Sequence, residues 1–108
     1  QDEQRKRFAI AQELGHLFLH MGYKTNAEIW EKQADKVPFQ EKDPEKVRQA
    51  NEFAAALLMP RYIFFLTLEA ASDIAESGKR TIHMQAVADF FNVSLSAAYT
   101  RAKIFGII

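Results

Sequence analysis

The spacing of apolar side chains near the start of the chain predicts a long helix over residues 1–22. Most residues from 2 to about 21 are good helix formers, and Gly22 is the expected C-terminal stop. Apolar residues recur there at helical spacing in two stripes, so the helix is expected to be largely buried. The stripes comprise Phe8, Ala11, Gly15, Phe18 and Leu19 on one side and Ile10, Leu14, Leu17 and Met21 on the other.

A second helix is predicted over residues 45–59. The run Asp43-Pro44-Glu45 has the order of an N-cap, a first helical residue and an acidic first turn, and Pro60 ends the pattern. Residues 23–44 mix charged residues with prolines and are expected to form a connecting region that holds a short helix or a hairpin. The apolar face of the second helix that should be buried comprises Val47, Ala50, Ala54, Leu57 and Leu58.

The rest of the chain also has helical spacing. Residues 60–78 predict a buried helix that ends at Gly78, with a strand as the alternative for its first residues. Residues 84–106 predict a helical, helix-turn-helix-like tail of two short helices, and Ser94 is the expected N-cap of the second. The fold class is therefore mainly α, or α+β if a small β element lies between or before the two long helices. Core residues expected in the 60–78 helix are Tyr62, Phe64 and Phe65.

Composition and charge narrow the classes of protein. The chain has 108 residues, 48% of them apolar, which fits one helical domain over residues 1–108; because it starts abruptly on charged helical residues, we expect it to be part of a longer chain. Its 14 basic and 14 acidic residues cancel, so no overall field attracts nucleic acid or a membrane. The lack of cysteine excludes disulfides, thiolate nucleophiles and Cys-ligated zinc. There is no secretory signal or long apolar span, and a cytoplasmic location is expected.

A stripe of polar residues crosses the first helix. Positions 12, 16 and 20 step round a helix by only about 40° each, which puts Gln12, His16 and His20 on one face with Glu13 beside them. The pattern is that of the H-E-x-x-H motif, in which two His bind Zn²⁺ and the Glu accepts a proton from metal-bound water. In this sequence Gln12 stands where the motif has its first His.

Three segments of the chain carry a wider pattern. Residues 7–20 are RFAIAQELGHLFLH, residues 49–60 are QANEFAAALLMP, and residues 87–94 are VADFFNVS, with Arg101 and Gly106 following. In these segments the chain resembles the ImmA/IrrE-like metallopeptidases of bacterial and phage regulatory systems, whose motifs are R-F-x-x-A-H-E-L-G-H-L-x-L-H, E-A-N-x-F-A-A-x-L-L-M-P and L-A-x-x-F-x-V-S. The resemblance implies a zincin-like domain. It also implies that active members are zinc hydrolases that cleave repressors or related regulators, often encoded beside them in phages or other mobile elements.

The family's three zinc ligands fall here on Gln12, His16 and Gln49, and its general base falls on Glu13. A neutral amide oxygen is a poor ligand for Zn²⁺, so two of the three ligand positions are degenerate. The resemblance therefore implies the fold more firmly than the activity. The leading hypothesis is a regulatory pseudo-peptidase with a protein partner, such as a transcriptional repressor, and with no cofactor. Its former site would be a hydrogen-bonded polar network in which Glu13 pairs with Gln12, His16 or a nearby Arg.

Two other hypotheses remain. The first is an active zinc peptidase with a rebuilt site, in which His20 substitutes as a ligand beside His16, or in which a partner supplies the missing ligands. In the rebuilt site the third ligand would be Glu13, Glu28 or Glu31. The second is a helix-turn-helix DNA-binding module in the tail. It is disfavoured, because Arg101 and Lys103 are too few cations for a helix that reads DNA, so we expect neither nucleic acid nor a membrane as partner.

Overall fold

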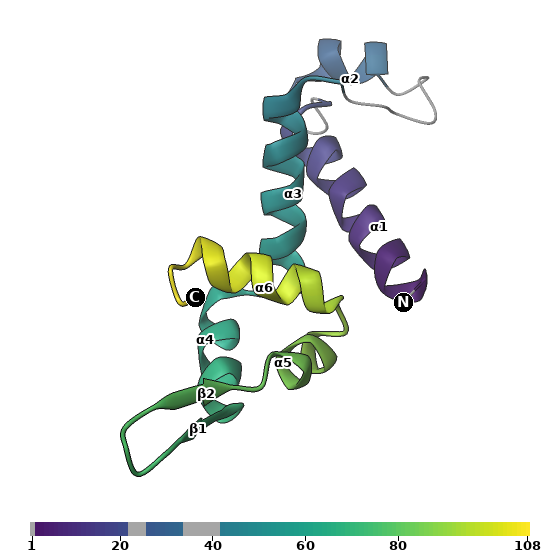
Figure 1. The fold of residues 1–108 in the computed structure, drawn as a ribbon. Coiled ribbons are helices and arrows are strands. Elements are labelled where there is room, and N and C mark those ends of the chain that lie inside the picture. Colours follow the sequence, from purple (N-terminus) through teal and green to yellow (C-terminus); the bar gives the residue numbers. More distant parts are fainter. Residues whose placement is uncertain (1, 22–25, 34–41) are drawn as a thin grey trace. The chain divides into compact units, whose positions relative to one another are not determined.

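Helices dominate the described part of the chain, which covers residues 2–21, 26–33 and 42–108 of a computed structural model (Figure 1). This confirms the predicted mainly helical fold with a small β element. The contacts divide the chain into two compact units, Lys6–Leu57 and the combination of Gln1–Arg5 with Leu58–Ile108. The elements in chain order are α1 (Asp2–Leu19), α2 (Ala27–Gln33), α3 (Pro44–Leu58), α4 (Arg61–Ala70), β1 (Ser72–Ile74), β2 (Arg80–Ile82), α5 (Met84–Phe91) and α6 (Leu95–Ile104).

The first unit contains most of α1, all of α2 and nearly all of α3. Helix α3 begins as predicted, because the Asp43 carboxylate accepts a hydrogen bond of 3.0 Å from the Glu45 backbone N–H. Helix α2 is the short helix expected within the connecting region. The predicted stop at Gly22 and residues 23–25 and 34–41 of that region lie outside the described residues.

The prediction that α1 buries two apolar stripes is wrong. The closest approach of α1 to α3 is on one side of the helix, where Gly15 lies close to Ala50. Ile10 on the other side is 61% exposed. Leu57 on α3, also expected inside, is half exposed. The buried residues of α1 and of the turn after it are Ala11, Gly15, His16 and Met21, and those of α3 are Ala50 and Ala54.

The second unit has an aromatic core built around α4. Phe64 is fully buried, and its ring centroid lies 5.8 Å from that of Phe91 and 5.9 Å from that of Phe105. The expectation that Tyr62 and Phe65 also belong to the core is wrong, since they are 75% and 38% exposed. The buried positions of α4 are instead Phe64 and Leu68, one turn apart on the same face.

The helix predicted for residues 60–78 is too long. It ends at Ala70, and the chain turns into an antiparallel hairpin in which Ser72 pairs with Ile82 and Ile74 with Arg80. The Ser72 hydroxyl donates to the Leu68 carbonyl at 2.5 Å, which satisfies a helix-end acceptor as the chain leaves α4. Gly78 has a φ of 84°, so it lies in the hairpin turn rather than at a helix end. The β element therefore follows both long helices, whereas it was expected between or before them.

The helical tail agrees with its prediction. Asn92 ends α5 in the left-handed conformation, with a φ of 54°, and the Ser94 hydroxyl accepts the Ala97 N–H at 3.1 Å as the N-cap of α6. Within the described ranges no single helix is long and apolar enough to cross a membrane, although the broken pair α3 and α4 meets that requirement by length and composition.

Candidate functional site

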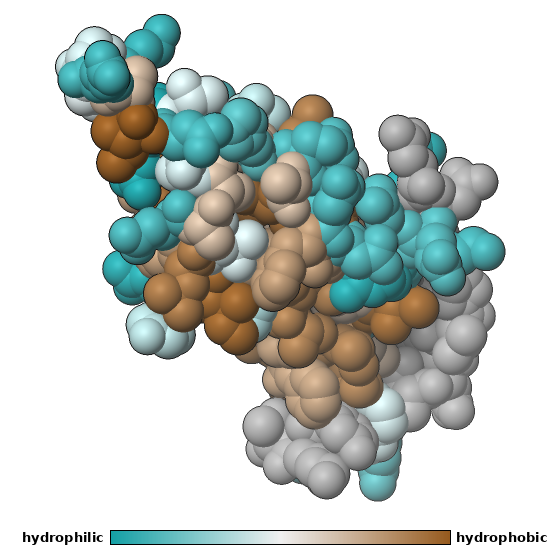
Figure 2. Space-filling view, turned by 90° about the horizontal axis from the view of Figure 1, so that it is seen from below, coloured by the Kyte–Doolittle hydropathy of each residue, from teal (hydrophilic) through white to brown (hydrophobic). Residues whose placement is uncertain are grey.

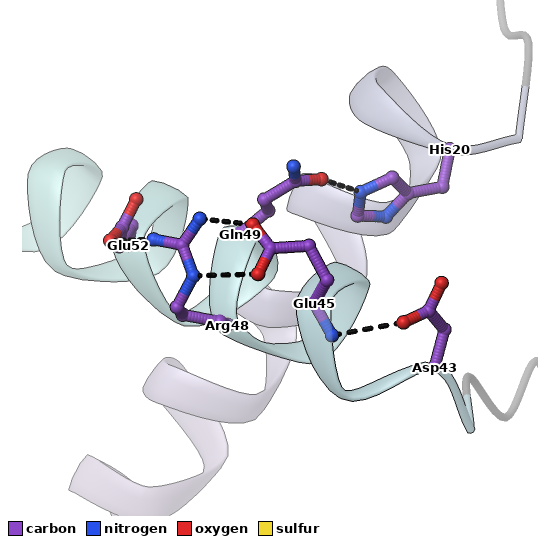
Figure 3. A network of polar contacts seen from close by, with 6 residues as sticks. All are labelled: His20, Asp43, Glu45, Arg48, Gln49 and Glu52. Carbon is purple, nitrogen blue, oxygen red and sulfur yellow. Dashed lines mark hydrogen bonds and ion pairs between the residues drawn. The ribbon is translucent and has the colours of Figure 1, made fainter.

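The imidazole of His16 on α1, that of His20 directly after α1, and the Gln49 amide on α3 form a chain of hydrogen bonds. The Nδ1 atoms of His16 and His20 lie 2.9 Å apart, and the Nε2 atom of His20 lies 2.8 Å from Oε1 of Gln49 (Figure 3 shows the second contact). His16 is only 7% exposed. The structure thus brings together three predicted site residues, with His20 as the link between the other two.

The chemistry of the three groups fixes the proton positions in the neutral network. The Gln49 side chain presents its amide oxygen, Oε1, to the His20 ring (Figure 3). That oxygen only accepts, so His20 donates from Nε2 and accepts at Nδ1. His16 therefore donates from Nδ1, and Nε2 becomes its unprotonated nitrogen.

Gln12 has a different partner from the other predicted ligand positions. Its side-chain amide donates to Oδ1 of Asn51 on α3. Asn51 was not predicted as a site residue, although it lies in the Q-A-N-E-F run that carried the family resemblance. We call the five residues Gln12, His16, His20, Gln49 and Asn51 the α1–α3 polar network.

Glu13 stands apart from this network. The residue is exposed, and no hydrogen bond or ion pair joins it to any described residue. The prediction that it pairs with Gln12, His16 or a nearby Arg is therefore wrong. One step along the helix from Gln12 turns the Glu13 side chain by about 100°, away from the side that α3 covers.

The residues at the zinc positions of the motif do not fit a zinc ion. Gln12 and Gln49 offer neutral amides that bond to two different residues, and the carboxylate and second imidazole that a zincin uses are absent from these positions. For the rebuilt site, the described residues contain no group of three His, Asp or Glu side chains able to hold a metal.

The exposed charges at the start of α3 are paired with one another. Arg48 bonds to Glu45 and to Glu52 along the same helix (Figure 3). The hydrogen bond from Arg48 holds the pKa of the Glu45 carboxyl below its usual value, and Glu45 is the main cause of a raised pKa for Arg48. These three charged side chains are therefore bonded within α3. Gln49, in the same stretch, is bonded instead to His20 at the end of α1.

Gly15 allows the two helices to meet. A Cβ atom at this position would lie 3.1 Å from the Ala50 Cα and 3.1 Å from the Phe53 Cβ, closer than side chains normally pack. We expect Gly15→Val to lower the free energy of unfolding by about 1–3 kcal/mol through overpacking. Ala9→Val on the exposed side of α1 is the control and should cost only about 0.5 kcal/mol. Urea denaturation followed by circular dichroism measures both, and equal losses would contradict the close approach.

The helical fold, with a Q-E-x-x-H motif on α1 bonded to α3, defines a metallopeptidase-like domain. A family model for the IrrE N-terminal-like domain, of the M78 peptidases, matches residues 1–103. The chain belongs to this family, which confirms the resemblance found in its sequence. Neither curated proteins nor solved structures yield a match.

Proposed function

We propose that this chain is a regulatory, catalytically silent member of its family that acts by binding a protein partner, a transcriptional repressor or related regulator. The observation that carries the proposal is the bonding of the three former ligand positions. Gln12, His16 and Gln49 have Asn51 and His20 as hydrogen-bond partners, so the polar groups that would hold a metal instead join α1 to α3.

The exposed Glu13 supports the same proposal. A carboxylate acts as general base in a zincin only because the metal lowers the pKa of its bound water from about 15.7 to about 7. Here the groups around Glu13 provide no such ion-binding set within the described structure. In this proposal the exposed Glu13 carboxylate is available to a partner.

The experiment is a measurement of zinc per chain by elemental analysis after purification without chelator and equilibration with micromolar Zn²⁺. We expect well below one equivalent of zinc and no change on His16→Ala. His83→Ala is the matched control, because His83 is an exposed histidine of the other unit. About one zinc per chain that is lost on His16→Ala but kept on His83→Ala would establish a rebuilt metal site. It would favour the active peptidase, to be assayed with Glu13→Gln as the inactive control.

The geometry of α6 gives little support to the hypothesis that the tail binds DNA. Its Arg101 side chain is buried and donates from Nε to the Met59 carbonyl at 3.0 Å, so it is engaged inside its own unit. Lys103 is the exposed cation left on this helix, and one phosphate contact is far from the number that DNA-binding domains use.

A further inference from the structure

Two arginines of the second unit lie against one aromatic ring. The guanidinium carbon of Arg61, at the start of α4, is 5.5 Å from the ring centroid of Phe105, and that of Arg101 on α6 is 4.5 Å from the same centroid. Arg61 also lies 5.8 Å from the Phe65 ring. We call Arg61, Arg101 and Phe105 the arginine cluster.

The positive charges of this cluster are not neutralised by the described part of the chain. No described carboxylate forms an ion pair with Arg61 or Arg101; the ion pairs found there join Arg48 to two glutamates and His83 to Asp73. Arg101 is 8% exposed, and among the described residues it donates only from Nε, to the Met59 carbonyl. No buried side-chain nitrogen in the described structure is left without a partner, so the terminal Nη atoms of Arg101 reach solvent and can accept an anion. Burial and then the charge of Arg61 lower the pKa of Arg101. Like charges held together without an anion are unfavourable, so an added anion is expected to stabilise the cluster.

The backbone beside the cluster adds further donors for an anion. Arg61 is the first residue of α4, and Pro60 at the N-cap provides no side-chain hydrogen bond to the free N–H groups of the first turn. The surroundings are apolar as well as cationic. Tyr62 and Ile104, next to Arg61 and Phe105 in the sequence, are 75% and 60% exposed. Exposed apolar side chains are common on this molecule, as the face drawn in Figure 2 shows.

We propose that the arginine cluster is a docking site for an acidic segment of a partner protein, in which carboxylates bind the guanidinium groups and an adjoining apolar side chain packs on the exposed residues of α4. Carboxylates match the planar donor pair of a guanidinium, and arginine over an aromatic ring is common in protein interfaces. The site goes beyond the proposed function, because it lies in the other unit and does not depend on whether α1 and α3 bind a metal. A membrane is a poorer fit, since stable electrostatic attachment needs several more cations than this cluster holds.

The test uses fluorescein-labelled acetyl-Asp-Glu-Phe-Glu-Asp-amide and its neutral counterpart acetyl-Asn-Gln-Phe-Gln-Asn-amide, with binding to the full chain followed by fluorescence anisotropy. We expect the acidic peptide to bind at least about tenfold more tightly than the neutral one, as one charge-assisted bond allows. Arg61→Gln should weaken the acidic peptide about tenfold. Lys103→Gln removes the same charge from an exposed position and should change binding less than about twofold, since isolated surface charges contribute little.

A second variant separates docking from folding. Arg101→Lys keeps the charge but loses the planar fork, so it should also weaken the acidic peptide, while circular dichroism reports whether the helices remain. The proposal is overturned if neither peptide binds, if both bind equally, or if Lys103→Gln has the effect of Arg61→Gln. It is also overturned if Arg61-dependent binding occurs only with vesicles of phosphatidylserine and phosphatidylcholine. None of these outcomes changes the zinc content, so this proposal and the proposed function fail separately.

Discussion

Replacing Gln12 by His and Gln49 by Glu should make the chain bind about one zinc ion. The double variant supplies two imidazoles and one carboxylate, the ligand set of a catalytic zincin site. His16 already has the required protonation, because it donates from Nδ1 to His20 and keeps Nε2 unprotonated. The loss of the bond between Gln12 and Asn51 costs little, since that contact is exposed to water.

Three controls make this result specific. Each single substitution should leave zinc binding weak, because one ligand position still holds an amide. Adding His16→Ala to the double variant should abolish binding. Adding His20→Ala should weaken it about 10–100-fold, since His20 orients the His16 ring without contacting the metal. A double variant that binds no zinc in elemental analysis and isothermal titration would show that α1 and α3 do not hold these positions at the spacing of a zincin.

The elements that could be predicted from sequence are those with local signals. Helix α5 begins at Met84 and ends at Phe91 as predicted, and Ser94 caps α6 because its hydroxyl needs only a backbone N–H three residues away. The end of α4 has no such signal. No Gly or Pro follows Ala70 before Gly78, and the helix stops at Ala70 because residues 72–74 pair with residues 80–82.

Hydrogen-bond partners that lie on a different helix or strand could not be predicted from the sequence. The Nε2 of His83 lies 2.6 Å from Oδ2 of Asp73, a contact made by the unpredicted hairpin. In the candidate site, the presence of Gln at two ligand positions predicted a hydrogen-bonded polar network, and both Gln side chains are hydrogen-bonded in the structure. That Gln12 meets Asn51 and Gln49 meets His20 depends on how α1 crosses α3 at Gly15, which no local pattern specifies.

Phe64→Ala should have the largest effect on stability, a loss of about 3–5 kcal/mol in the free energy of unfolding. The side chain is fully buried and its ring contacts Phe91 and Phe105, so truncation leaves a cavity between α4, α5 and the end of α6. Tyr62→Ala on the same helix is the matched control, because that ring is 75% exposed and its removal should cost less than about 1 kcal/mol.

Urea denaturation followed by far-ultraviolet circular dichroism measures both variants. A domain of this size is stable by only about 5–15 kcal/mol, so Phe64→Ala should shift the midpoint strongly or leave part of the chain unfolded without urea. Phe105 also supports the two guanidinium groups of the arginine cluster, and its ring packs on Phe64. The same cavity should therefore weaken binding of the acidic peptide. Equal destabilisation by the two variants would mean that α4 does not bury Phe64 in preference to Tyr62.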